Sequence, residues 1–385
     1  MKNFLCIILL LAPLHLLGTT QDELATTLKQ LVAFETLPAN LQANKEALQW
    51  VEMQIEGLPL KHQYHEFDGH PCLVITTQET KRPTLWLVAH MDVVSGAKSL
   101  FSATRKGEKL YGRGVYDMKM AIACYLLLLK ELGASLANYN FGSMLTSDEE
   151  VGGMHGTKCL LEAGYSSDVA FLPDGGFLWN FEESAKGVLH VKIAAHGSSA
   201  HSSRPWEGKN AIDQLMHVLE KVRLLFEKEK AQAGQFFPTH NVGLIQGGTL
   251  INQVPDYAEA KIDIRYPPDI SPEALYAKMV EITKQYEGVT LEKIIGGSSH
   301  HVDLRLSYFQ NFRKLAHDLY GIKVGSVKSH GSSDARFFGA HNIPVLVIAP
   351  NGGDIHSDRE WVDLADLVRF YEVLKAWVVT TSPKP

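Results

Sequence analysis

Residues that can bind metal ions or transfer protons lie beside five separate segments of this 385-residue chain. Four of the segments are apolar runs that predict β-strands, and the fifth precedes an apolar stretch that predicts a buried helix. The residues are His90, Asp92, Asp117, Glu149, Glu150, Asp174 and His356. Two neutral imidazoles and several carboxylates are a ligand set that suits zinc. If one carboxylate bridges two ions, the same residues form a two-metal site, which can activate water for hydrolysis.

Each of these residues has an ordinary structural interpretation when it is taken alone. An aspartate before a helix, such as Asp117, commonly caps that helix, and a neighbouring pair such as Glu149 and Glu150 is commonly a solvated surface feature. These interpretations weaken together, because ligands of open α/β sheets bind beyond the carboxyl ends of the strands. The sequence therefore predicts that the five segments converge on one site.

The elements that must position this site are short apolar strands that alternate with helical stretches. The predicted strands are 84–88, 141–146, 169–172 and 344–349, and the predicted buried helix is 118–132. Continuous apolar strands alternating with helices are typical of an α/β fold, with a mostly parallel sheet covered by helices on both faces. We expect this sheet to form the catalytic, metal-binding domain.

The pattern changes in the middle of the chain. Segments 188–195, 240–245, 257–266 and 289–295 predict strands, and segments 209–231 and 271–287 predict helices. Their order, β-α-β-β-α-β, is that of a ferredoxin-like α+β domain. We expect this domain to be inserted at 188–297, between the parts 21–187 and 298–385 of the catalytic domain.

The first 20 residues predict a signal peptide of an exported protein, periplasmic or secreted. Lys2 precedes the apolar run 4–17, and the small residues 18–20 follow it. An uncleaved N-terminal anchor is the alternative interpretation. Elsewhere no apolar run reaches the roughly 20 residues that a membrane span needs, so we expect no stable span.

Composition limits the other possibilities. Apolar residues make up 45% of the chain and charged residues 21%, the balance of a folded globular protein of two domains. The net charge of −6, without a run of Lys or Arg, argues against nucleic acid as a partner. Beyond the predicted signal the cysteines are Cys72, Cys124 and Cys159, an odd number that we expect to be buried free thiols.

Five motifs make the chain resemble a family of di-zinc peptidases and deacylases. That family contains aminoacylase, carboxypeptidase G, acetylornithine deacetylase and succinyl-diaminopimelate desuccinylase. The motifs are AHMDVV (89–94), GRGVYDMK (112–119), SDEEVGG (147–153), LPDGG (172–176) and HSDREWV (356–362). The resemblance covers nearly the whole mature chain, and it implies a zinc-exopeptidase type of fold with the insert as a lid and dimerisation domain.

The resemblance also implies two divalent metal ions. Zinc is the expected metal, although cobalt and manganese can share such ligands. By this resemblance His90 and Asp174 would bind one ion, Glu150 and His356 the other, and Asp117 would bridge them.

Two further residues have roles by the same resemblance. Asp92 would hydrogen-bond the imidazole of His90 and fix its orientation. Glu149 would be the general base and acid, for which it must stay off the metals. The family also has a cis peptide bond after the bridging aspartate, here between Asp117 and Met118.

The inserted domain carries a histidine that implies a dimer. His201 matches a family histidine that reaches the active site of the partner subunit, where it would stabilise an oxyanion. We therefore expect a homodimer built through the insert. Taken alone, His201 among serines is an ordinary loop residue.

Substrate-binding residues are implied in the same way. Asn252 matches a substrate-binding asparagine, and alone it is a turn residue ahead of a proline. Arg265 lies on one strand face and is either a clamp for a substrate carboxylate or part of a solvated charged face. Gly331 and Ser332 lie in a segment that resembles the loop lining the substrate pocket.

Together these features predict a metal-dependent hydrolase of an amide or peptide bond next to a free carboxylate. The substrates would be N-acyl amino acids, dipeptides or C-terminal residues of peptides, so the enzyme would be a deacylase, dipeptidase or carboxypeptidase. A biosynthetic deacetylase or desuccinylase is an alternative that the predicted export disfavours. A non-catalytic binding protein is a second alternative, but it would not need Glu149. An aminopeptidase of the related fold without the insert is disfavoured by the segment 188–297.

Overall fold

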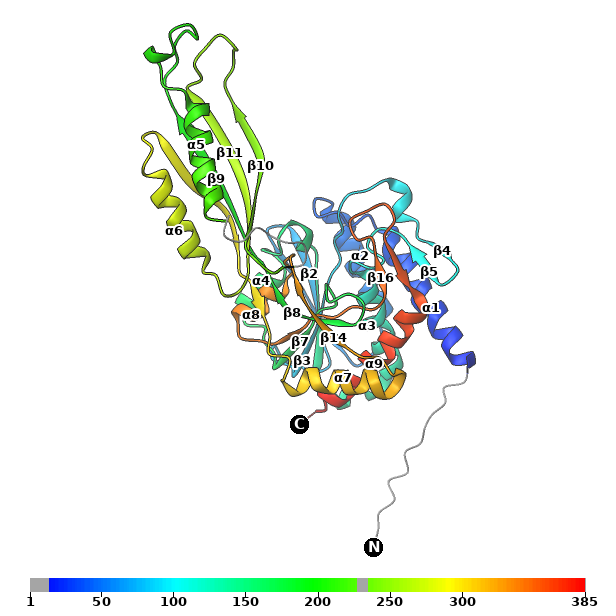
Figure 1. Ribbon diagram of the computed structural model, residues 1–385. Helices are drawn as coiled ribbons and strands as arrows, with labels where there is room; N and C mark the ends of the chain where they lie inside the picture. Colours follow the sequence, from blue (N-terminus) through cyan, green and yellow to red (C-terminus); the bar gives the residue numbers. More distant parts are fainter. Residues whose placement is uncertain (1–13, 227–234, 385) are drawn as a thin grey trace. The chain divides into compact units, whose positions relative to one another are not determined.

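The computed structural model describes residues 14–226 and 235–384, and the chain in it divides into two compact units (Figure 1). The first unit contains the residues up to Phe181, Leu304–Ser326 and the residues from Ile343 onward. The second unit contains Glu182–Asp303 and Val327–Asn342. The predicted insert, 188–297, lies within the second unit. The second unit also takes in residues 327–342, which we expected in the catalytic domain.

The first unit is built on a six-stranded sheet. Its strands, in spatial order, are β1 (Lys61–Phe67), β2 (His70–Thr76), β6 (Phe141–Thr146), β3 (Leu85–His90), β7 (Val169–Phe171) and β15 (Val345–Leu346). The strands β6, β3, β7 and β15 pair in parallel, and they are the four that the apolar runs predict. β1 and β2 add an antiparallel edge. The predicted α/β class with a mostly parallel sheet is confirmed.

Helices pack against this sheet and against one another. They are α1 (Leu14–Ala33), α2 (Leu41–Gln54), α3 (Lys119–Leu132), α4 (Thr157–Glu162), α7 (Ser307–Tyr320) and α9 (Leu364–Thr381). α3 contacts β3, α2 contacts β2, and α1, α3 and α9 contact one another. Phe171 of β7 packs against Phe312 of α7 and against Phe370 and Trp377 of α9, so the sheet and these helices share one core.

The helix α3 is buried on all sides along most of its length, as the sequence predicts. Within the described residues, the segment Lys119–Asn138 is long and apolar enough to cross a membrane by length and composition alone, but most of it is buried inside the fold. A core helix of a globular unit has these same properties.

A small sheet completes the first unit near the metal-binding motifs. It consists of β16 (Gly352–Gly353), β17 (Trp361–Asp363), β5 (Lys109–Tyr111) and β4 (Thr104–Lys106). The short 3₁₀ helices of this unit are η1 (Lys98–Phe101), η2 (Gly133–Asn138) and η3 (Glu149–Val151). β17 pairs with β5, which holds the last predicted motif beside the segment that precedes α3.

The second unit has the predicted ferredoxin-like order β-α-β-β-α-β. Its four-stranded antiparallel sheet runs β10 (Thr239–Gly247), β11 (Tyr257–Tyr266), β9 (Gly187–His196) and β12 (Val289–Gly297). The helices α5 (Ala211–Leu224) and α6 (Pro272–Thr283) pack on one face of it. Asn210 caps α5, and Ser271 caps α6 ahead of Pro272, the residue pattern that favours a helix start.

A smaller sheet adjoins the ferredoxin-like part. Its strands are β13 (His300–His301), β8 (Asn180–Ala185) and β14 (Gly325–Ser329), accompanied by α8 (Ala335–Ala340), and η4 (Pro205–Glu207) lies in the loop after β9. The strands β8 and β14 begin where the chain passes from one unit to the other.

The N-terminal prediction falls partly outside the described residues, which exclude 1–13. The helix α1 begins at Leu14 and continues through the expected cleavage positions near Gly18 and Thr20. Leu24 and Leu28 are buried, so the part of α1 after the predicted signal belongs to the core. None of the three described cysteines forms a disulfide, as expected, but Cys159 is partly exposed rather than buried.

Candidate metal centre

The predicted metal-binding residues all lie in the first unit, just beyond the ends of its parallel strands. His90 is the last residue of β3, Glu150 lies in η3 after β6, and Asp174 follows β7. Asp117 lies two residues before α3, and His356 lies between β16 and β17. The convergence that the sequence predicts is therefore present.

These five residues form two groups that share one carboxylate. His90, Asp117 and Asp174 offer ligand atoms within 4.8 Å of one another, and so do Asp117, Glu150 and His356. Nε2 of His90 lies 3.1 Å from Oδ1 of Asp117, and Nε2 of His356 lies 3.1 Å from Oδ2. Each oxygen of Asp117 thus faces a different imidazole, as a carboxylate bridging two ions requires.

The two histidines and the carboxylates of the site shift one another's pKa values. Burial lowers the pKa of His90, but the hydrogen bond with Asp117 and the surrounding carboxylates outweigh burial and raise that pKa well above its usual value. Hydrogen bonds with Asp117 and then Glu150 raise the pKa of His356 to about 10. Burial raises the pKa of Asp117, yet the two imidazoles lower it further, to well below its usual value. Positive charge at either imidazole is therefore favoured at this position.

The donor set fits divalent cations. Each group combines one imidazole nitrogen with carboxylate oxygens, a combination typical of zinc sites. The ordinary interpretation of Asp117 does not hold, because the residue at the N-cap of α3 is Met118 and no side chain caps this helix. The peptide bond between Asp117 and Met118 is cis, as the resemblance implies.

Asp92 makes hydrogen bonds with His90 of the first group and with the turn that carries Glu150 of the second group. Nδ1 of His90 lies 3.0 Å from the main-chain oxygen of Asp92, and 3.6 Å from its carboxylate. The carboxylate instead accepts hydrogen bonds from the main-chain N–H groups of Glu149 at 3.2 Å and Glu150 at 2.9 Å. The expected contact with His90 is therefore made by the main chain, and the side chain positions the two glutamates. Burial raises the pKa of Asp92 to about 6.

The two neighbouring glutamates differ in position. Glu150 belongs to the second group of ligands, with Oε2 at 3.2 Å from Nε2 of His356. Glu149 belongs to neither group, although its charge contributes to the raised pKa of His90. A carboxylate near the groups but outside both is suited to proton transfer.

Glu360 is a residue of the site that the sequence reasoning missed. Its buried carboxylate accepts hydrogen bonds from the main-chain N–H groups of Gly114 at 2.9 Å, Tyr116 at 3.0 Å and Asp117 at 3.1 Å. Nη1 of Arg113 also donates to it, at 3.1 Å. Both charged residues lie inside quoted motifs, so the signal was present, but only the fold reveals that they meet.

A glycine is required in the segment that Glu360 holds. Gly114 has a φ of 78°, and a Cβ there would lie 2.5 Å from Cγ1 of Val93. A side chain would therefore both strain the backbone and displace the chain that leads to Asp117.

The predicted substrate-binding residues lie in the second unit. His201 is an exposed loop residue with Nδ1 at 2.8 Å from Oγ of Ser203, and it pairs with Gln253, beside Asn252. These two predicted residues are thus neighbours within that unit.

The remaining predicted residues of this unit make local contacts. Arg265 donates from Nε and Nη2 to the carboxylate of Asp263, at 2.8 and 3.2 Å. Ser332 accepts a hydrogen bond from Arg336 at 2.9 Å, and the N–H of its neighbour Gly331 donates to Ser329 at 3.1 Å.

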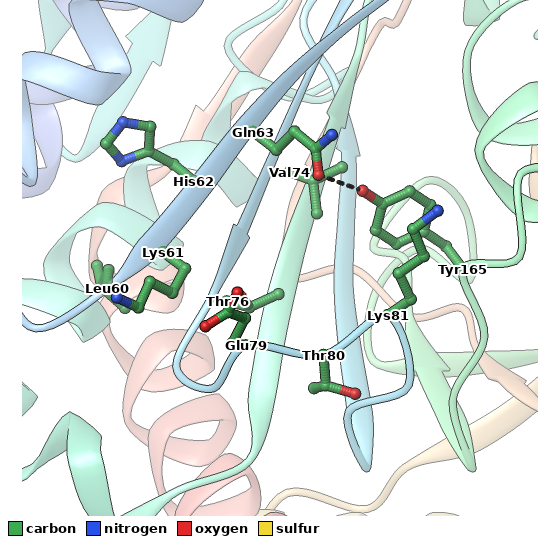
Figure 2. Close-up of a pocket in the computed structure, with 10 residues that line it drawn as sticks. All are labelled: Leu60, Lys61, His62, Gln63, Val74, Thr76, Glu79, Thr80, Lys81 and Tyr165. Atoms are coloured by element: carbon green, nitrogen blue, oxygen red, sulfur yellow. Dashed lines mark hydrogen bonds between the residues drawn. The ribbon is translucent and has the colours of Figure 1, made fainter.

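A cavity of about 590 Å³ lies elsewhere in the first unit, on the strands β1 and β2 (Figure 2). It is lined by Leu60, Lys61, His62, Gln63, Val74, Thr76, Glu79, Thr80, Lys81 and Tyr165. Tyr165 closes one side and donates a hydrogen bond to Oε1 of Gln63 at 3.1 Å. None of the predicted metal-binding residues lines this cavity, so it is separate from the metal centre.

Similarities to curated proteins extend over nearly the whole chain. Succinyl-diaminopimelate desuccinylase of Rickettsia akari (strain Hartford) is 26% identical over 380 residues, which cover 90% of this chain and 96% of the relative. The enzyme of the same name from Rickettsia bellii (strain OSU 85-389) is 25% identical, with 92% and 96% covered.

Solved structures share the fold. A tripeptidase from Staphylococcus aureus matches with a TM-score of 0.73 and 20% identity, covering 93% of this chain and 99% of its own. A metallo-carboxypeptidase from Sulfolobus solfataricus matches with a TM-score of 0.74 and 18% identity, covering 93% and 100%. A sequence model of Peptidase family M20/M25/M40 matches residues 86–380. The chain therefore belongs to Peptidase family M20/M25/M40 and is a metal-dependent hydrolase of amide bonds.

Proposed function

We propose that this enzyme cleaves an amide or peptide bond next to a free carboxylate, using two divalent cations held by the two groups that share Asp117. The observation that carries the proposal is the position of Asp117, whose two carboxylate oxygens each lie 3.1 Å from a different imidazole. A protein that only bound a ligand would not need this arrangement together with Glu149.

The assignment of ligands follows from the groups. His90 and Asp174 would hold one ion, Glu150 and His356 the other, and Asp117 both. Zinc is the metal we propose, because imidazole and carboxylate ligands without thiolate suit it, while cobalt and manganese can share them. When bound, the ions would supply Lewis acidity to a water molecule and to the substrate carbonyl.

The protein's own groups would move the proton. Glu149 would accept a proton from the attacking water and later deliver it to the leaving nitrogen, acting first as base and then as acid. Its main chain is held by the carboxylate of Asp92 at 3.2 Å, which fixes the position from which it acts. Glu150 would remain a ligand, so the two neighbouring carboxylates would divide the roles.

Residues of the second unit would recognise the substrate. We assign the oxyanion contact to His201, and substrate binding to Asn252, Arg265, Gly331 and Ser332. The adjacent placement of His201 and Asn252 supports this assignment. Arg265 would bind a carboxylate while it also contacts Asp263, because a guanidinium has five N–H donors.

A second candidate function is favoured by the curated relatives. Their name, succinyl-diaminopimelate desuccinylase, describes removal of a succinyl group from an amino acid, which is also cleavage of an amide in a molecule with free carboxylates. The solved structures of similar fold include a tripeptidase and a carboxypeptidase. The acyl group and the peptide are therefore the two substrate types to compare.

We also propose a homodimer formed through the second unit. The strand β10 is an edge of the four-stranded sheet, and Leu244 and Ile245 on it are exposed by 64% and 60%. Leu250 and Ile251 in the following turn are exposed as well. An exposed apolar edge strand invites pairing with another strand, and a second copy of the chain would cover it by two-fold symmetry.

We further propose that the protein is exported. The support is the sequence pattern of Lys2, the apolar run 4–17 and the small residues that follow. Export would place the enzyme where it meets peptides and N-acyl amino acids outside the cytoplasm.

One screen tests the proposed function. The purified mature protein with added zinc is offered N-acetyl amino acids, N-succinyl amino acids and dipeptides, each with its carboxylate free or amidated. We expect cleavage of the free acids, loss of most of the kcat/KM on amidation, and about two metal ions per chain by mass spectrometry. Equal cleavage of the amidated substrates would contradict the carboxylate requirement, and no cleavage in the presence of zinc would contradict the function.

A further inference from the structure

Lys186 is a buried ammonium group without a hydrogen-bond partner among the described residues. It joins β8 to β9 in the second unit, and its side chain is only 1% exposed. Its Nζ has neither a hydrogen bond nor an ion pair with any described residue. A buried charge in this state is costly, so an unpaired buried lysine indicates a ligand that the chain itself does not provide.

The ring of Phe236 contacts three basic side chains of this region. Nζ of Lys186 lies 5.7 Å from the ring centre of Phe236, and Nζ of Lys328 lies 5.6 Å from the same centre. The ring of His330 meets Phe236 edge-on, with the ring centres 5.7 Å apart. Cation–π attraction of this kind is modest and does not replace an anion.

The acid two residues before Arg265 on β11, on the same face of the strand, is already engaged. Asp263 accepts two hydrogen bonds from Arg265 and also lies 3.4 Å from Nε2 of His190. Burial, and then the charge of Arg265, lowers the pKa of Lys186, which places the two cations near each other. Lys186 in turn contributes, after burial, to the lowered pKa of His330. Asp263 is therefore shared between Arg265 and His190, and Nζ of Lys186 has no hydrogen-bond partner among the described residues.

Arg265 of the cluster lies on the face of the sheet opposite the helices α5 and α6. Along β11, Ile264 and Tyr266 point into the core formed with α5 and α6. Arg265 alternates with them and lies on the face of the sheet opposite α5 and α6. A ligand bound on this face would not contact the core that the sheet forms with α5 and α6.

We propose that Lys186, Lys328, Arg265 and His330 form a carboxylate-binding pocket, and that its ligand is a dicarboxylic part of the substrate, such as a succinyl group or an acidic side chain. The ammonium groups of Lys186 and Lys328 can each pair with one carboxylate, in addition to the existing pair of Arg265 with Asp263. Hydrogen bonds between charged partners are stronger than those between neutral groups. The inference rests on the proposed function for the identity of the substrate. A free small dicarboxylate has the same chemistry, so the experiment separates the two sources.

Lys186→Met tests the pocket, because methionine keeps the apolar stem and removes the charge. Succinate binding is measured by calorimetry on the full chain, with Lys186→Arg as the conservative variant. Lys278→Met is the matched control, since Lys278 is an exposed lysine of α6, on the other face of the sheet. We expect Lys186→Met to weaken succinate binding at least tenfold, Lys186→Arg to retain most of it, and Lys278→Met to leave it unchanged. We also expect the melting temperature of Lys186→Met to rise by a few degrees, because an unpaired buried charge is removed.

Kinetics identify the source of the carboxylate. For Lys186→Met, the ratio of kcat/KM for an N-succinyl amino acid to that for its N-acetyl analogue should fall about tenfold, through KM rather than kcat. Unchanged succinate affinity, or a lower melting temperature, would overturn the pocket. Weaker succinate binding with an unchanged ratio would overturn the substrate assignment in favour of a free dicarboxylate. If the wild type cleaved no amide at all, the proposed function would fail, while calorimetry would still decide on the pocket.

Discussion

The carboxylate of Glu360 accepts a hydrogen bond from the main-chain N–H of Asp117 at 3.1 Å, so the residue shared by both metal-binding groups is held from the C-terminal part of the chain. The same carboxylate holds Gly114 and Tyr116 and pairs with Arg113. Arg113 also donates to the main-chain oxygen of Ser357, next to His356, at 3.1 Å. Glu360 and Arg113 therefore couple the position of Asp117 to that of His356.

Glu360→Gln should weaken metal binding without touching a ligand. The amide offers one acceptor oxygen in place of two, and it leaves Arg113 buried without its ion-pair partner. We expect metal affinity to fall about tenfold or more, as when a group supporting a ligand is removed. The free energy of unfolding should fall by about 3 kcal/mol, the scale of a broken buried pair. Competition with a chromogenic chelator and urea denaturation measure the two effects, and Glu56→Gln on the surface is the control.

The double variant Arg113→Met/Glu360→Met separates positioning from stability. Replacing both partners by apolar groups should restore much of the free energy of unfolding, because no unpaired charge remains. Metal affinity should stay low, because the N–H of Asp117 still lacks its acceptor. Recovery of both properties together would show that Glu360 is important for stability only.

Glu149→Ala should lose turnover and keep its metal ions, whereas Asp117→Ala should lose the metal ions. The first variant should lose at least about a hundredfold in kcat but keep two metal ions, since a general base is removed and no ligand is. The second should lose metal from both groups, because Asp117 is common to them. Metal content and kcat are measured on the same preparations. Normal turnover in Glu149→Ala would falsify the assignment of the base.

The site was predictable from the sequence where one segment carries both the strand and the ligand. The apolar run that forms β3 ends at His90, and the run that forms β6 leads into Glu150, so strand pattern and motif agree. The hydrogen bonds of Glu360 were not predictable although it lies in a motif, because its partners lie about 245 positions away and only the pairing of β17 with β5 brings them together.

The strand β1 and the placement of residues 327–342 were also not predictable from the sequence. The strand β1 reads KHQYHEF and is mostly exposed, so it lacks the apolar alternation that reveals a strand. Residues 327–342 join the second unit through spatial contacts alone, since no change of composition marks them. Asp92 does contact His90 as expected, but through its main-chain oxygen and not its carboxylate. A sequence pattern does not specify which of these atoms makes the contact.

The second unit should lose stability in mild acid because of His300. This residue is 2% exposed, and neither ring nitrogen has a hydrogen-bond partner among the described residues. Burial, and then the charge of His301, lowers the pKa of His300 to about 4. The unfolded chain, with a pKa near 6.5, takes up the proton first, so stability falls as the pH drops from about 6.5 toward 4.

Urea denaturation at pH 7 and pH 5 measures this effect. The wild type should lose about 2 kcal/mol between the two values, since one pKa unit corresponds to about 1.4 kcal/mol. His300→Leu should lose much less, while the exposed His217→Leu in α5 should behave as the wild type does. The same loss in His300→Leu as in the wild type would show that other groups cause the acid sensitivity.

Export predicts the start of the mature chain. N-terminal sequencing of the protein from its native host should begin near Thr19 or Gln21, after the small residues that follow the apolar run. Such a start would remove the first turns of α1 and keep Leu24 and Leu28, which are buried in the core. A mature protein that still begins at Met1 in the cytosol would rule out the signal.

A homodimer with shared active sites predicts recovery of activity from two inactive variants. His201→Ala and Glu149→Ala are each expected to lose turnover, and they are mixed in equal amounts after dissociation and reassembly. In a mixed dimer, the site with an intact Glu149 receives an intact His201 from the partner. Half of the dimers are then mixed and each has one complete site, so about a quarter of the wild-type activity should return.

The exposed edge of β10 provides the control for this mixing. Ile245→Lys places a charge on the proposed interface, so this variant should be monomeric by light scattering and should also lose activity. Combining Ile245→Lys with each inactive variant should abolish the recovery. No recovery in mixed dimers whose formation is confirmed, or full activity in a monomeric Ile245→Lys variant, would show that His201 acts within its own chain or not at all.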